Sequence, residues 1–208
     1  MQIGFQIFFL ISILMGAVIH EYSHGWMAWR YGDDTAKVMG RLTLNPIAHI
    51  DPFGTILLPL LLWISTGGSF LFAYAKPVPV NLYRLRDQKI GPAAVAFAGP
   101  GSNILTALVF GLIIRFFPAT INPVFITYLS IIVFANLLLA IFNLVPIPPL
   151  DGSRILDVFL PPQFNHIKMF LHQYGFILLI FFILFLFRLI LPIISLLFYI
   201  ITGYKFIL

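Results

Sequence analysis

The chain has 208 residues, of which 61% are hydrophobic and only 9% are charged, so it carries more apolar surface than a water-soluble domain can bury. Several stretches are apolar over the roughly 20 residues needed to cross a bilayer, which excludes a soluble enzyme and indicates a polytopic membrane protein. The net charge of +5 does not indicate a nucleic-acid partner, because the basic residues lie in short loops, where they normally set membrane topology.

The absence of cysteine limits the chemistry that the chain can perform. It excludes disulfides, thiolate metal ligands and a thiol nucleophile, so any bound metal must be held by imidazole and carboxylate groups. The length allows a single membrane-embedded domain, residues 1–208, with about five or six hydrophobic segments, and leaves no room for an appended globular domain. We therefore expect an all-α polytopic membrane fold surrounded by the lipid bilayer.

In chain order, residues 3–29 form the first apolar segment, which lacks the basic start of a cleaved signal peptide and predicts a retained transmembrane helix. Residues 41–44 alternate polar and apolar side chains, which indicates a short strand. The apolar run 54–74 is interrupted by Pro59 and Gly67-Gly68, so a simple crossing is doubtful. Later apolar runs cover residues 91–117, 123–145 and 174–191, followed by a tail, 192–208, that recrosses the membrane or lies at its interface.

Basic residues in two loops predict the topology of the amino-terminal half. Lys37 and Arg41 follow the first helix, and four basic residues follow the interrupted run: Lys76, Arg84, Arg86 and Lys89. Positively charged loops favour the cytoplasmic side, and both loops can lie there only if the chain between them returns to its own side. We therefore expect residues 40–76 to form a re-entrant or β-hairpin-like element that lines a water-filled cavity.

The first apolar segment contains the pattern His-Glu-x-x-His at residues 20–24. Positions four apart share one face of a helix, so His20 and His24 can reach the same metal ion. Glu21 is the only glutamate in the chain, and its carboxylate can approach a metal-bound water without binding the metal, as a general base requires. The alternative is polar packing between helices, but three ionisable residues in this order favour metal-dependent hydrolysis.

A catalytic zinc usually has three protein ligands, so the two histidines leave one ligand to be found. The candidates are the remaining aspartates and histidines, namely Asp33, Asp34, Asp51, Asp87, Asp151, Asp157, His49, His166 and His172. Asp151 is the best placed, because it follows a long apolar run and three prolines that hold the backbone extended and non-helical at membrane depth. Its alternative role is an ordinary cap for a helix over residues 153–159.

These motifs resemble those of the site-2 proteases, a family of intramembrane zinc metalloproteases. The family pattern places His-Glu-x-x-His first, Gly-x-x-x-Asn second and Asn-x-x-Pro-x-x-x-Leu-Asp-Gly last, and the chain has them in this order at residues 20–24, 99–103 and 143–152. Residues 40–52 also look like the membrane-associated region that follows the first motif in bacterial members. The resemblance covers residues 18–152 and implies a minimal form without PDZ or CBS domains.

The resemblance implies a Zn²⁺ ion held by His20, His24 and Asp151, and cleavage of a transmembrane protein or peptide substrate inside the bilayer. We expect a zinc-activated water to attack the peptide bond, with Glu21 as the catalytic general base. It also implies that Asn143 binds the substrate backbone.

The sequence leaves two possible roles open for several polar residues. The alternative for Asn143 is a helix-packing amide like Asn136, and close helix contact is the stronger reading for Gly99 and Asn103. His49 and Asp51 either orient a metal ligand or form a turn.

Two other functions compete with proteolysis. One is a membrane transporter or channel that uses the His/Asp cluster for metal or protons. The other is a family member that binds metal and no longer cleaves its substrate. The presence of all four residues expected to act in catalysis, His20, Glu21, His24 and Asp151, argues against this possibility. We expect an integral protein of a prokaryotic plasma membrane with its active site toward the cytoplasm, no nucleic-acid partner, and a possible homo-oligomer.

Overall fold

The structure is a computed structural model that describes residues 3–65, 67, 75–117 and 122–206. Its described residues are helical or irregular, with no β-strand among them. The α-helices are α1 (Ile3–Arg30), α2 (Thr35–Val38), α3 (Leu58–Ser65), α4 (Gly91–Phe116), α5 (Pro123–Asn143), α6 (Asp151–Phe159), α7 (Asn165–Phe181) and α8 (Leu191–Thr202). Short 3₁₀ or π segments are η1 (Pro46–His49), η2 (Pro52–Leu57), η3 (Leu82–Arg84), η4 (Pro162–Phe164), η5 (Phe182–Leu186) and η6 (Phe187–Leu189).

Four helical stretches are long and apolar enough to cross a membrane, and they confirm an all-helical integral membrane protein. They are Gly4–Arg30, Gly91–Phe116, Pro123–Asn143 and Pro162–Leu189. Large apolar side chains remain exposed along all four, as expected for surfaces that face lipid. The remaining apolar helices, α3 and α8, have eight and 12 residues, which is too short to span about 30 Å of hydrocarbon at 1.5 Å per residue.

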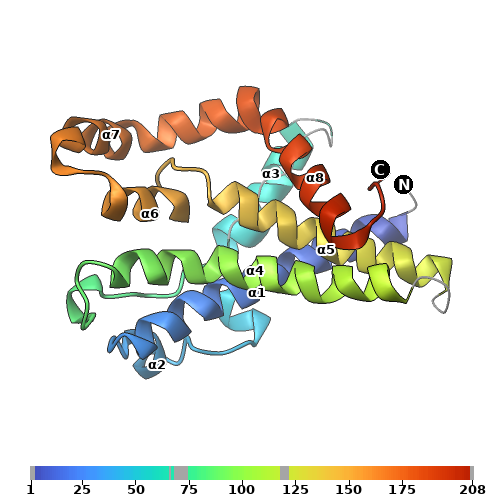
Figure 1. The fold of residues 1–208 in the computed structure, drawn as a ribbon, viewed down its shortest axis with the longest axis horizontal. Helices are drawn as coiled ribbons and strands as arrows, with labels where there is room; N and C mark the ends of the chain where they lie inside the picture. The colour runs from blue at the N-terminus through green and yellow to red at the C-terminus, as the bar shows by residue number, and fades with distance from the viewer. Residues whose placement is uncertain (1–2, 66, 68–74, 118–121, 207–208) are drawn as a thin grey trace.

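Helix α4 lies at the centre of the bundle, where it packs against α1, α5, α6 and α8 (Figure 1). The main apolar core lies between α4, α5 and α8, and includes the buried side chains of Ile114, Leu137, Ile194 and Phe198. Helix α6 lies between α4 and α7 in the same view, which brings the segment after α5 back over the bundle. This return brings Asp151, the first residue of α6, against His20 and His24 of α1.

The prediction of a β-hairpin-like element after the first helix is wrong for the described residues. Residues 41–44 have no strand partner, and an isolated strand is not stable because its backbone groups are left unpaired. Side chains form hydrogen bonds with the backbone of this segment instead. Thr43 Oγ1 accepts from the Asn45 amide, and His49 Nε2 donates to the Thr43 carbonyl. Residues 66 and 68–74 of the expected re-entrant region lie outside the described residues, so its path relative to a membrane stays a prediction.

The carboxy-terminal third contains more helix than the hydropathy pattern predicts. Residues 147–173 lie between the apolar runs 123–145 and 174–191, but they contain α6 and the first half of α7. Polar side chains lower the hydropathy there without breaking the helix, and α7 then continues through η5 and η6 to Leu189. The expected tail, of which residues 207–208 lie outside the described part, contains α8, which ends at Gly203 with a φ of 81°.

Candidate active site

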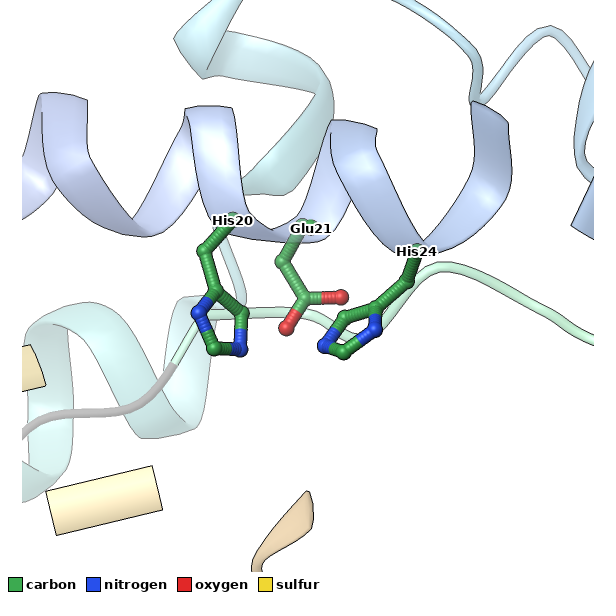
Figure 2. A group of neighbouring side chains, drawn as sticks. All are labelled: His20, Glu21 and His24. Atoms are coloured by element: carbon green, nitrogen blue, oxygen red, sulfur yellow. The ribbon is translucent and has the colours of Figure 1, made fainter. Parts of the chain in front are cut away.

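Helix α1 presents His20, Glu21 and His24 toward one space, as Figure 2 shows. The two imidazole rings lie edge to face with centroids 4.6 Å apart, and the residues are only 6% and 9% exposed. One potential ligand atom from each of the three residues lies within 4.8 Å of the others. The spacing in the sequence therefore predicted the relative placement of these side chains.

Asp151 lies next to His20 and His24 although it is far from them in the sequence. It is the first residue of α6, and its Oδ2 lies 3.0 Å from Nε2 of His20 and 3.2 Å from Nε2 of His24. The loop before it folds tightly, because the Leu150 amide donates to the carbonyl of Ile147 and the Ser153 hydroxyl donates to the carbonyl of Leu150. Gly152 makes this turn possible, since a Cβ there would lie 2.2 Å from the carbonyl oxygen of Leu144.

The second nitrogen of each imidazole is already engaged on the side away from Asp151. Nδ1 of His24 lies 2.7 Å from the carbonyl oxygen of Val95, which can only accept a hydrogen bond, so this nitrogen carries the proton. Nδ1 of His20 lies 2.8 Å from Oδ1 of Asn103. The amide of Asn103 is oriented by its Nδ2, which donates to the Gly16 carbonyl at 3.0 Å, so Oδ1 is the acceptor from His20.

The consequence is that three electron-pair donors converge with no proton between them. With hydrogen on Nδ1, each neutral imidazole presents the lone pair of Nε2 to Oδ2 of Asp151. That carboxylate oxygen is buried and accepts no hydrogen bond from the described residues. Such a set is repulsive by itself and attractive around a cation.

The three atoms also fit the size of a zinc ion. Ligands at about 2.0–2.1 Å in a tetrahedral arrangement lie roughly 3.3 Å from one another, close to the 3.0 and 3.2 Å between Asp151 and the histidines. Two imidazoles and a carboxylate are a usual donor set for zinc, and three protein ligands leave one position open. The residues present therefore suit a catalytic zinc site.

Helix α4 forms the wall beside the two histidines and supports both of them. A Cβ on Gly99 would lie 2.5 Å from Nε2 of His24 and 2.6 Å from Nε2 of His20, so only glycine leaves room for the rings. The expectation that Gly99 permits a close helix approach agrees with this contact. The reading of Asn103 as a packing amide was incomplete, because Asn103 is fully buried and also bonds His20.

Glu21 is partly buried between the two histidines and is not bonded to either of them. Its Oε2 accepts a hydrogen bond of 2.8 Å from the backbone N–H of Val78. Sequence reasoning did not find this contact, nor the one from His24 to the Val95 carbonyl. Both partners are backbone groups, which every residue carries, so no sequence pattern indicates these contacts.

The remaining candidates lie in other environments. Asn143 is the last residue of α5, is half-buried, and donates from Nδ2 to the carbonyl of Leu139. The turn reading agrees with the contacts of His49 and Asp51: His49 donates to the Thr43 carbonyl, and Asp51 accepts from two following amides. Neither side chain bonds a histidine of the cluster.

The other potential ligands form contacts elsewhere. Asp157 pairs with His172, and Asp34 pairs with Arg84. The buried Asp33 accepts from the amide of Asn81.

Comparisons with known proteins agree with these motifs. The profile of peptidase family M50 matches residues 118–184. A Bacillus subtilis protein named "putative zinc metalloprotease YwhC" is 38% identical over 177 residues, which cover 82% of this chain and 77% of that protein. A Mycolicibacterium smegmatis relative with the corresponding name Rip2 is 30% identical, over 86% of this chain and 67% of its own length. No solved structure matches the chain.

A more distant relative, named a zinc metalloprotease of Methanocaldococcus jannaschii, is 26% identical over 76% of this chain and 36% of its own length. The relatives carry protease names, so the comparisons favour an enzyme over the transporter or channel that the sequence left open. The chain therefore belongs to peptidase family M50, the site-2 proteases, and is a zinc metalloprotease of the membrane.

Proposed function

We propose that this protein hydrolyses peptide bonds of membrane-spanning substrates, with zinc held by His20, His24 and Asp151 and with Glu21 as the general base. The observation that carries the proposal is the convergence of two unprotonated Nε2 atoms on the buried Oδ2 of Asp151. When bound there, zinc would polarise the substrate carbonyl and lower the pKa of the water that it binds. Residues 1–208 act as one domain in this proposal.

Glu21 moves the proton in this reaction. Its carboxylate lies between the imidazoles without bonding them, so it can accept the proton of the attacking water and return it to the leaving amine. A general base of this kind contributes about 10²–10⁴-fold to the rate.

Asn143 is proposed to bind the substrate backbone. It ends α5 directly before the loop that carries Asp151, and its Oδ1 forms no hydrogen bond within the described part of the chain. This oxygen can accept an N–H of an extended substrate, while Nδ2 remains bonded to Leu139. A donor role for Nδ2 toward the developing oxyanion would require that the bond to Leu139 breaks.

The cytoplasmic side is the proposed location of the site in a prokaryotic plasma membrane. Residues 75–80 contact Glu21 and continue into a loop with the basic residues Arg84, Arg86 and Lys89, which favour the cytoplasm. The proposed substrate is therefore a transmembrane segment that is unwound near this side, because a helix keeps its carbonyls in its own hydrogen bonds.

The test is cleavage of a panel of transmembrane peptides by the purified protein in lipid nanodiscs. We expect a zinc chelator to abolish cleavage and added zinc to restore it. Glu21→Gln is expected to keep its zinc and to cleave about 10²–10⁴-fold more slowly. Asp34→Asn, which removes an exposed carboxylate, is the matched control. Cleavage that persists in the chelator or in Glu21→Gln would contradict the proposal.

A further inference from the structure

An extended segment, residues 75–80, passes beside the carboxylate of Glu21 (pale green trace in Figure 2). Its central tripeptide is Pro77-Val78-Pro79, and proline has no backbone N–H. Val78 therefore supplies the only amide donor of the tripeptide. That N–H donates to Oε2 of Glu21 over 2.8 Å.

Both ends of this segment are tied to other parts of the protein. The Lys76 amide donates to the carbonyl of His49 at 2.9 Å, and Arg41 Nη2 donates to the carbonyl of Lys76 at 2.9 Å. At the other end, the Asn81 amide donates to Oδ2 of Asp33, which is fully buried, at 2.6 Å. The position of the Val78 N–H is thus set by its surroundings and not by Glu21 alone.

The Val78 side chain fixes the distance between this segment and α1. Val78 is only 7% exposed, and a Cβ on Gly25 would lie 2.8 Å from its Cγ1. Gly25 is four residues after Glu21 and shares its face of the helix. The glycine therefore lets the segment lie close enough for the N–H to reach the glutamate.

We propose that the Val78 N–H is a positioning group that holds the Glu21 carboxylate between His20 and His24. A glutamate side chain has several rotatable bonds, and a hydrogen bond to a charged acceptor restricts them. Oε1 accepts no hydrogen bond within the described ranges, so it is available to take the proton. The inference rests on the proposed role of Glu21 as general base.

The contact itself can be tested without any measurement of activity. Because Glu21 is the only glutamate, cell-free synthesis with carboxyl-¹³C-glutamate gives an infrared carboxylate band from this residue alone. Incorporating α-hydroxyvaline at position 78 replaces the N–H by an ester oxygen and keeps the side chain. We expect the labelled band to shift in this ester protein. The same ester at Val80, whose N–H has no partner in the described part of the chain, should leave the band unchanged.

The positioning role is tested by kinetics on the peptide that the native protein cleaves fastest. We expect the Val78 ester to lower kcat by about tenfold or more, with KM and zinc content unchanged, because the base is present but poorly oriented. A purely structural role would instead lower thermal stability and zinc content together. The Val80 ester controls for the ester chemistry.

Gly25→Ala tests the same inference by an ordinary substitution. The added methyl group pushes against Val78, so we expect a lower kcat and a shifted glutamate band with zinc retained. Adding Val78→Ala removes the clashing Cγ1 and keeps the N–H, so the double variant should recover much of the lost kcat. Failure of this recovery would argue that Gly25 acts through other neighbours.

The outcomes separate this inference from the proposed function. An unshifted band in the Val78 ester overturns the contact, whatever the enzyme cleaves. A shifted band with unchanged kcat overturns the positioning role, and a raised kcat would identify the contact as inhibitory. If the native protein cleaves no peptide of the panel while the band still shifts, the proposed function and the positioning role fail and only the contact stands.

Discussion

Oδ1 of Asn103 lies 2.8 Å from Nδ1 of His20, and this contact fixes which nitrogen of the histidine faces Asp151. Asn103 is in turn held by Asn136, whose Oδ1 accepts from Asn103 Nδ2 at 3.0 Å while its own Nδ2 donates to the carbonyl of Ile132. A chain of amides through α4 and α5 therefore orients a proposed metal ligand on α1.

Replacing Asn103 by leucine should weaken zinc binding. The variant removes the acceptor that keeps the proton on Nδ1 of His20, and loss of such a partner typically costs about 10–100-fold in metal affinity. Competition against a zinc-binding dye measures the effect. Thr106→Val, one turn along α4, removes a hydroxyl that donates to the Ser102 carbonyl and has no other partner among the described residues, so it serves as the control. Equal affinity in both variants would show that Asn103 does not support the ligand.

Gly99→Ala should displace the two histidines and release zinc. A methyl group at this position would lie 2.5 Å from Nε2 of His24, which is closer than any unstrained contact. Metal analysis of the purified protein gives the zinc content, which we expect to fall well below that of the native enzyme. Gly101→Ala is the matched control, because the nearest atoms to its added carbon belong to the side-chain ring of Phe97, at 3.2 Å. Full zinc occupancy in Gly99→Ala would contradict the geometry.

Asp151→Asn should lose zinc although the side chain keeps its size. The substitution removes the negative charge that faces His20 and His24 and puts an amide in its place. Asp157→Asn lies on the same helix and, among the described residues, affects the side-chain pair with His172, so its zinc content should stay native. Zinc titration by calorimetry distinguishes the two variants, and equal binding by both would exclude Asp151 as a ligand.

Gly152→Ala should destabilise the turn that presents Asp151. Its Cβ would meet the Leu144 carbonyl at 2.2 Å, and backbone cannot move aside as a side chain can. We expect a loss of about 1–3 kcal/mol or more, seen as a lower midpoint of thermal unfolding in detergent. Gly4→Ala is the control, because nothing lies within 4 Å of the added carbon. An unchanged midpoint in Gly152→Ala would show that the loop can relax.

The parts of the site that sequence predicted are those that depend on spacing within one helix. His20 and His24 share a face because of helical geometry, and the boundaries of α4 and α5 follow from continuous apolar runs. Asp151 was one of nine candidates, and the proline-rich context singled it out. Its approach to the histidines, however, depends on how α6 folds over α4, which no local pattern encodes.

The parts that sequence missed depend on contacts between distant segments. Val78 and Val95 contribute backbone atoms, which every residue has, so their roles appear only in the folded chain. The alternation of residues 41–44 predicted a strand, but a four-residue pattern requires a partner strand that the described chain does not provide. The start of α7 was missed because His166, Lys168 and neighbouring polar residues lower the hydropathy of its first turns.

The position of Asp151 at the start of α6 has a consequence for biogenesis. During translation, α1 with its two histidines leaves the ribosome long before the segment after α5 is made. Because α6 packs against α4, that segment can fold back only after α4 and α5 are in place. During this interval the nascent chain lacks one member of the proposed ligand set, Asp151. With Asp151 as the proposed third ligand, the proposed zinc site is complete only in a molecule that has been translated through α6.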